Sequence, residues 1–245
     1  MPKQTALVTG RSRLIALTSL MASTVFLVTA AFSLYVPETR GYFNFGESAV
    51  YLTSIILPPS WAALASGFGS MLADVSLGYY HYAPATLLIK GAEAFVVSTL
   101  MRKHPKIFAG GSVAANLLLS ISLPLLIGLL GLSLYTGTVE LSFALPFTSF
   151  VSYGAWQLAG VVWLAVALVL GIYLVYANLK RIGDAWTLFS LVSGGAIMVL
   201  GYFLYEQLIL GVAAIAEVPF NLMQVLIGVS IVLPVMHQVK QLSSG

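Results

Sequence analysis

Residues 185–212 read AWTLFSLVSGGAIMVLGYFLYEQLILGV, and this stretch decides the class of fold. Glu206 is the one charged residue in it. A helix needs about 20 apolar residues to cross the hydrocarbon core of a bilayer, and a helix satisfies its own backbone hydrogen bonds there. The stretch therefore predicts a membrane-spanning helix, and the rest of the chain has to be compatible with lipid.

The composition of the whole chain has the same character. Of the 245 residues, 59% are hydrophobic and 8% are charged, whereas an average soluble domain has about 25% charged residues. The chain has no cysteine, which excludes disulfides and thiolate metal sites. The three histidines, 81, 104 and 237, are far apart in the sequence, so we expect no metal site. We also expect no cofactor and no nucleic-acid partner.

The hydropathy pattern predicts an all-α integral membrane protein with about eight transmembrane helices. We expect them at about 14–36, 47–57, 60–78, 84–101, 107–135, 155–178, 185–212 and 218–239. The second and third are short and meet at Pro58, so they tilt or pair rather than each standing as a full span. Pro124 is expected to kink the fifth. The first helix resembles a signal peptide, but an apolar run of about 22 residues favours a retained span.

The positions of lysine and arginine orient these helices. Cytoplasmic loops of membrane proteins are enriched in both residues. With the amino terminus inside, nine of the eleven basic residues fall on the cytoplasmic side: Lys3, Arg11, Arg13, Arg102, Lys103, Lys106, Lys180, Arg181 and Lys240. Arg40 falls in an outside loop, and Lys90 lies within a helix. Both termini are therefore expected in the cytoplasm, and the number of helices is even, six or eight.

Ionisable residues within the predicted helices are candidates for function, because an unpaired charge in lipid costs several kcal/mol. They are Glu47, Asp74, Lys90, Glu93 and Glu206. Asp74, Lys90 and Glu206 are expected at similar depths in the outer half of the membrane. Lys90 is expected to form a structural ion pair with Asp74 or another acid. Four acids then face one lysine. Either some carboxyls are protonated, or a polar or cationic ligand binds there.

Aromatic and amide side chains lie near these charges in the sequence. Tyr42, Phe43 and Asn44 precede Glu47 in the first outside loop, and Asn221 and Gln224 enter the last helix from the same face. Aromatic faces with a few polar groups suit a flat polar ring, although tyrosines are also enriched at membrane interfaces whatever the function. A second aromatic group at residues 79, 80 and 82 fits the interfacial alternative. We expect a water-accessible cavity that opens to the outside.

Several short motifs resemble the S components of energy-coupling factor (ECF) transporters. They are GYFNFGE at 41–47, ASGFGSMLAD at 65–74, YAPATLLIKGAE at 82–93, GYFLYE at 201–206 and PFNLMQ at 219–224. The similarity covers about 40–102 and 185–240. S components usually have six helices, so residues 104–183 look like a helical pair inserted into a single transmembrane domain that spans 1–245.

The resemblance implies the substrate-binding subunit of an ATP-driven importer in a prokaryotic cytoplasmic membrane. Such a subunit takes a vitamin or vitamin precursor from outside and associates with a transmembrane coupling subunit and two ATPases. The ligand-binding residues implied are Tyr42, Phe43, Asn44, Glu47, Glu206, Asn221 and Gln224. Asp74, Lys90 and Glu93 would form a structural polar network. Small residues on the first helix, Thr18, Ser19, Ala22 and Ser23, would form the coupling surface.

Two alternatives remain open at this point. One is a stand-alone ion-coupled secondary transporter of a small polar solute, with Glu206 or Asp74 carrying the proton. The other is a membrane scaffold without a ligand. We expect no enzyme, since Glu47 and Glu206 lack an electrophile or metal to act with. The excess of acids favours thiamine-like, pyrimidine or pyridoxamine-like cations, while flavin and other neutral rings stay open.

Overall fold

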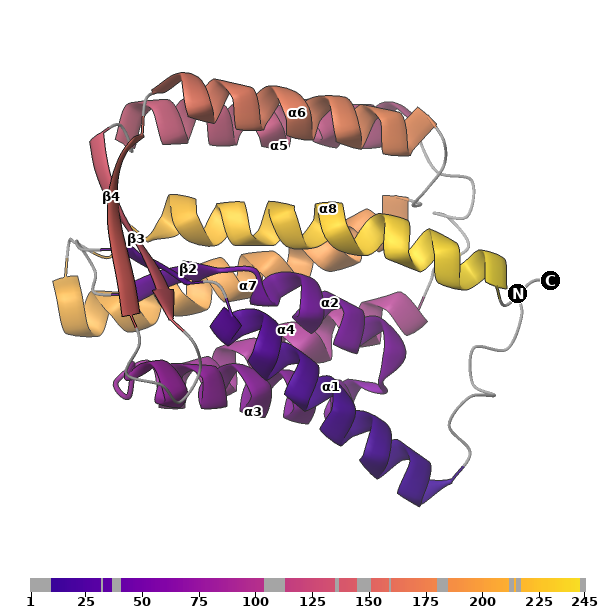
Figure 1. Ribbon diagram of the computed structural model, residues 1–245. Helices are drawn as coiled ribbons and strands as arrows, with labels where there is room; N and C mark the ends of the chain where they lie inside the picture. Colours follow the sequence, from indigo (N-terminus) through magenta and orange to yellow (C-terminus); the bar gives the residue numbers. More distant parts are fainter. Residues whose placement is uncertain are drawn as a thin grey trace.

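The apolar runs of the sequence form helices, and two of the connections between them form β-hairpins (Figure 1). The computed structural model describes residues 10–31, 33–36, 41–103, 113–134, 137–144, 151–158, 160–179, 185–211, 214 and 217–242. The helices in this part of the chain are α1 (Arg11–Ala31), α2 (Gly46–Ile56), α3 (Pro59–Leu77), α4 (Ala83–Arg102), α5 (Val113–Leu134), α6 (Gly160–Leu179), α7 (Ala185–Leu210) and α8 (Val218–Leu242). Each overlaps one of the predicted helices.

The all-α prediction is confirmed for the bundle, but two short antiparallel hairpins that it did not include join some of the helices. The predicted first helix was too long, because α1 ends at Ala31 and Ser33–Val36 forms β1, which pairs antiparallel with β2 (Gly41–Asn44). Pro37 follows β1 in the sequence, and the residue before a proline is disfavoured in a helix. The predicted sixth helix was also too long. Residues 155–158 belong to β4 (Val151–Leu158), which pairs with β3 (Gly137–Ala144).

The helices are arranged as a bundle with one outer layer. Figure 1 shows α5 and α6 side by side, beyond α8 from the other helices. These two helices pack mainly on each other, while α4 packs between α3 and α7, and α2 packs on α8. The β3–β4 hairpin runs from the outer layer to β1, so both hairpins lie at one end of the bundle. Within the predicted inserted pair, 104–183, residues 104–112, 135–136, 145–150, 159 and 180–183 lie outside the described residues.

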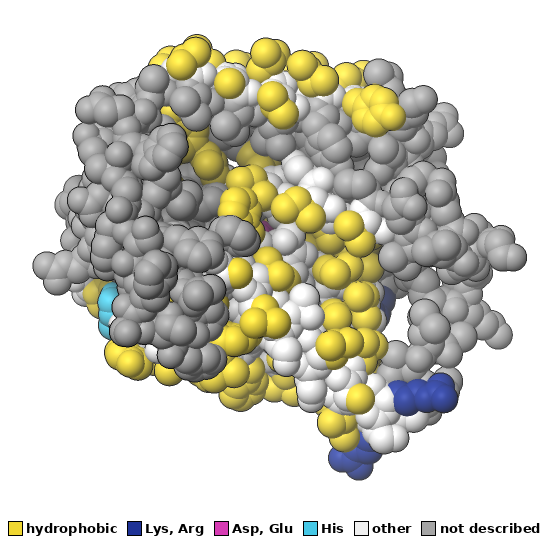
Figure 2. All heavy atoms as spheres, in the orientation of Figure 1, with side chains coloured by type: hydrophobic (Ala, Val, Ile, Leu, Met, Phe, Trp, Pro, Cys, Tyr) yellow, Lys and Arg dark blue, Asp and Glu magenta, His cyan; other side chains and the backbone are white. Residues whose placement is uncertain are grey.

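The surface of the bundle is suited to lipid. Large apolar side chains are exposed on the long helices, for example Leu88 at 72%, Leu118 at 70% and Leu208 at 85%. Figure 2 shows hydrophobic side chains over most of the described surface on one face. Three helices in the described part of the chain are long and apolar enough to cross a membrane: Arg11–Ala31, Ala83–Arg102 and Trp186–Ile209. The chain is therefore a membrane protein, and a total of eight spans stays a prediction.

Glycines let α3 approach its neighbours closely. A Cβ atom at Gly69 would lie 2.5 Å from the carbonyl oxygen of Ala22 in α1, and one at Gly67 would lie 2.6 Å from that of Leu87 in α4. In lipid, no hydrophobic effect drives helices together. Small residues favour helix packing there because they let two backbones approach closely. This packing fixes the ends of α3 and α4, where the polar residues of the interior lie.

Candidate ligand-binding site

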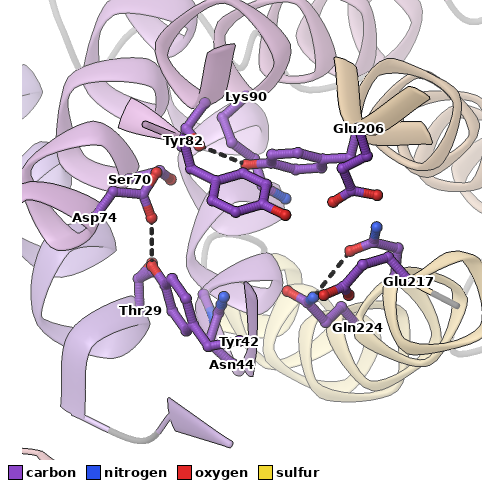
Figure 3. Close-up of a pocket in the computed structure, with 14 residues that line it drawn as sticks. Thr29, Tyr42, Asn44, Ser70, Asp74, Tyr82, Lys90, Glu206, Glu217 and Gln224 are labelled. Atoms are coloured by element: carbon purple, nitrogen blue, oxygen red, sulfur yellow. Dashed lines mark hydrogen bonds between the residues drawn. The ribbon is translucent and has the colours of Figure 1, made fainter. Parts of the chain in front are cut away.

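An open cavity lies at the hairpin end of the bundle, and it holds about 500 Å³ of space when the solvent at its mouth is included. Its walls come from α1, β2, the carboxyl ends of α3 and α7, and the amino ends of α2, α4 and α8 (Figure 3). The lining residues are Thr29, Tyr42, Asn44, Gly46, Ser70, Asp74, Tyr82, Thr86, Lys90, Tyr202, Glu206, Glu217, Asn221 and Gln224. The lining is thus largely polar and aromatic, within a bundle whose outer surface is apolar.

One side of the cavity is built around Asp74. The hydroxyl of Tyr42 donates a hydrogen bond to Asp74 Oδ1 at 2.6 Å, and the Tyr42 ring stacks on Tyr79 with centroids 4.5 Å apart. Burial, with the nearby carboxylate of Asp74, raises the pKa of Tyr42 well above its usual value, so the hydroxyl stays protonated and remains a donor. The buried atoms Asp74 Oδ2, Thr29 Oγ1 and Ser70 Oγ have no hydrogen-bond partner among the described residues.

The opposite side carries Glu206 from α7 with Glu217, Asn221 and Gln224 at the start of α8 (Figure 3). Gln224 Nε2 donates to Asn221 Oδ1 at 3.2 Å. Glu206 is 2% exposed, and its Oε2 atom has no hydrogen-bond partner in the described part of the chain. Both sides of the cavity therefore present buried oxygen atoms that can accept hydrogen bonds.

Tyrosines form the wall between these two sides. The rings of Tyr82 and Tyr202 lie 6.4 Å apart at 59°, and the Tyr202 hydroxyl bonds to Thr86 Oγ1 at 3.0 Å. Burial, followed by the charges of Glu206 and Glu217, raises the pKa of Tyr82 well above its usual value. Tyr82 is therefore a neutral hydrogen-bond donor beside two acids.

Lys90 forms ion pairs with two buried acids. Its Nζ atom donates to Glu47 Oε2 from α2 and to Glu93 Oε2 at 3.1 Å, one turn further along α4. The expectation that Lys90 pairs with another acid is confirmed, but a pair with Asp74 was wrong. Glu93 is a neighbour on the same helix face, and the packing of α2 brings Glu47 to the same point. Asp74 instead accepts from Tyr42.

The structure brings together most of the residues predicted to bind a ligand. Five of them border the cavity, namely Tyr42, Asn44, Glu206, Asn221 and Gln224. Glu47 does not border it, and its side chain pairs instead with Lys90, which does. Phe43 is placed in β2 opposite Leu34, and its side chain lies outside what the structure describes. Ligand binding by these residues stays a prediction.

Other lining residues were missed. Glu217 immediately precedes an apolar run. This position would have predicted an acid at the amino end of a membrane helix. Tyr82 was assigned to the interfacial group, yet it is buried and lines the cavity, while Tyr80 is 68% exposed. Thr29, Ser70, Thr86 and Tyr202 gave no signal that separates them from ordinary polar residues of a membrane helix.

The four residues predicted as a coupling surface lie on two faces of α1. Ser19 and Ser23 are exposed, and Ser23 Oγ donates to the Ser19 carbonyl. Thr18 Oγ1 donates to the Leu14 carbonyl at 2.7 Å, and the Ala22 carbonyl faces Gly69 of α3. The exposed pair is available to another protein, whereas Ala22 takes part in packing within the chain.

Comparison with known proteins gives one family and one relative. Residues 11–143 match the model of the family described as "ECF-type riboflavin transporter, S component". Over 73 residues the chain is 38% identical to a Pyrococcus woesei protein described as "Uncharacterized protein in gap 3'region"; this covers 30% of the chain and 49% of that protein. The chain thus spans about half the length of this curated relative. No solved structure matches the chain.

Proposed function

The chain belongs to the family of ECF-type riboflavin transporter S components, and from this membership we propose that it captures a vitamin or vitamin precursor from outside a prokaryotic cell. The family confirms the resemblance drawn from the sequence motifs. Its members are substrate-binding membrane subunits of transporters and are not an enzyme family. Three further points are proposals: the identity of the cargo, the source of energy and the membrane in which the chain lies.

The observation that carries the proposal is the set of unpartnered polar atoms around the cavity. Burying a polar group without a hydrogen bond costs free energy, and the cost is larger for a carboxylate. Asp74 Oδ2, Glu206 Oε2, Thr29 Oγ1 and Ser70 Oγ all border one cavity and lack partners among the described residues. A polar ring with several hydrogen-bonding groups would satisfy them together.

The distribution of cations supports a cavity that faces outward. Arg11 and Arg13 begin α1, and Arg102 and Lys103 end α4, at the end of the bundle opposite the hairpins (Figure 1). Arg102 also bonds to the Ser54 and Ile56 carbonyls at the end of α2, at 3.3 and 3.5 Å. By the positive-inside rule this end lies in the cytoplasm. The proposed topology has both termini inside and the cavity outside.

We also propose that a coupling subunit and two ATPases complete the transporter. The sequence contains no Gly-x-x-x-x-Gly-Lys-Ser/Thr phosphate loop, so ATP hydrolysis would come from other chains. Ser19 and Ser23 on the exposed face of α1 are the proposed contact with the coupling subunit. The layer of α5 and α6 lies away from α1 (Figure 1), which leaves that contact accessible.

Thermal unfolding of the detergent-purified chain tests ligand binding. We expect one compound in a panel of vitamins and precursors to raise the midpoint, since a ligand at 100 times its Kd stabilises the folded state by about 2.7 kcal/mol. The Asn221→Ala variant should lose most of this shift. Thr99→Ala, which removes a hydroxyl bonded to its own helix away from the cavity, should keep it. No shift with any compound would contradict the proposal.

A further inference from the structure

We infer that the buried group formed by Glu47, Lys90 and Glu93 is a proton-binding site, in which the two carboxyls share one proton and the group has no net charge. Its charge does not depend on which cargo binds in the cavity. Three features support the site: the number of charges in the group, two carboxyl oxygens that receive no hydrogen bond, and the glycines that enclose them.

The group has two acids and one base. Lys90 Nζ donates to Glu47 Oε2 and to Glu93 Oε2, and no other cationic side chain in the described part of the chain is paired with either acid. Glu47, Lys90 and Glu93 are 1%, 5% and 0% exposed. With both acids ionised, the group would carry a net negative charge inside a bundle surrounded by lipid, where an unpaired charge is costly. One bound proton removes this charge.

The second oxygens of the two carboxyls indicate where the proton lies. Glu47 Oε1 and Glu93 Oε1 are buried and receive no hydrogen bond from any donor among the described residues. The two carboxyls lie within hydrogen-bonding reach of each other. Ionised carboxylates only accept hydrogen bonds and repel each other, so a hydrogen bond between them requires that one carries a proton. The proton then belongs to the pair and not to one residue.

Helices α7 and α8 enclose the group with glycines. A Cβ atom at Gly228 of α8 would lie 2.8 Å from Glu47 Cγ, and one at Gly194 of α7 would lie 3.4 Å from Glu93 Cγ. Glycine has no side chain, so these two contacts bring neither a cation nor a side-chain donor to the acids. The close approach of the two helices also leaves little space beside the carboxyls.

Other ionisable side chains near the group do not supply a positive charge. Tyr51 of α2 lies near Glu47, and the ring of Tyr202 has its centroid 6.0 Å from Lys90 Nζ. A tyrosine is uncharged at neutral pH. Asp74 of α3 also acts on Lys90, but as a further acid. Lys90 borders the cavity (Figure 3), so the shared proton leaves the cavity wall at Lys90 without a net charge from this group.

Infrared spectroscopy of the full chain in lipid detects the proton, because a protonated carboxyl has a carbonyl band that a carboxylate lacks. At neutral pH we expect Glu93→Gln to lose intensity in this band, and Glu47→Gln to lose the same amount. Either change leaves one acid paired with Lys90, and that acid needs no proton. Thr99→Ala, which removes an exposed hydroxyl bonded to its own helix, should leave the band unchanged.

The stability of the same variants gives a second readout. Each single change keeps one ion pair and should alter the constant for unfolding in SDS by less than about tenfold. The double change leaves Lys90 without a counter-charge and should raise that constant by about 100-fold or more.

Two results would overturn the shared proton. One is a carboxyl band that is unchanged in the folded single variants, and the other is failure of both single variants to fold. If only one of them folds, its spectrum decides, since both are expected to lose the same band. Neither readout involves a ligand, so either result leaves the proposed function as it stands.

Discussion

Replacing Lys90 with methionine is expected to lower the free energy of unfolding by about 3–5 kcal/mol, the largest effect on stability that we predict. The ammonium donates to Glu47 and Glu93, and all three side chains are buried. Methionine fills similar space but leaves two carboxylates without a counter-charge in a lipid-surrounded bundle. Unfolding by SDS in mixed micelles measures the difference.

A double-mutant cycle identifies the ion pair as the cause. Glu47→Gln alone should cost less, because Lys90 keeps Glu93 as a partner at 3.1 Å. In the Glu47→Gln background, the further change Lys90→Met should then cost less than it does alone, since one of the stranded carboxylates is gone. Equal costs in both backgrounds would show that Glu47 and Lys90 do not stabilise each other.

The second large effect is expected at the contact between α3 and α4. Gly67→Ala would place a Cβ atom 2.6 Å from the Leu87 carbonyl oxygen, a backbone atom that can move only with its helix. We expect the two helices to separate and the free energy of unfolding to fall by about 1–3 kcal/mol. The carboxyl end of α3 holds Asp74, so ligand affinity should fall as well.

Gly91→Ala is the matched control at the same contact. Its Cβ atom would lie 3.4 Å from the Ala63 carbonyl oxygen, close to ordinary contact. Alanine also has a higher helix propensity than glycine by about 1 kcal/mol. Gly91→Ala should therefore be neutral or mildly stabilising under the SDS assay. A loss at Gly91 as large as that at Gly67 would argue against close backbone packing as the cause.

The helices could be predicted because lipid imposes one strong pattern on the sequence. Each long apolar run became a helix, and the errors lie at the ends of runs. Ser33–Val36 and residues 155–158 are as apolar as the helices beside them, but they are strands. Hydropathy does not distinguish an apolar strand from the last turn of a helix. Whether such a segment is a strand depends on a pairing partner. The partner of β1 is β2, which follows Pro37 in the sequence.

The candidate site could be predicted in part, for a similar reason. Acids such as Glu206 and Asp74 stand out within apolar runs, and their depth followed from helix geometry. Which acid pairs with Lys90 depends on how α2 is rotated against α4, and the spacing along the chain contains no such information. Glu217 was missed because it lies outside the predicted span, where an acid has no apparent cost.

Uptake of the stabilising compound tests the central claim most directly. Cells that produce this chain with a coupling subunit and two ATPases should accumulate the radiolabelled compound. Cells that produce the chain alone, or the chain with ATPases that cannot hydrolyse ATP, should not. Accumulation by the chain alone, abolished when the proton gradient is collapsed, would contradict the account and establish an ion-coupled carrier.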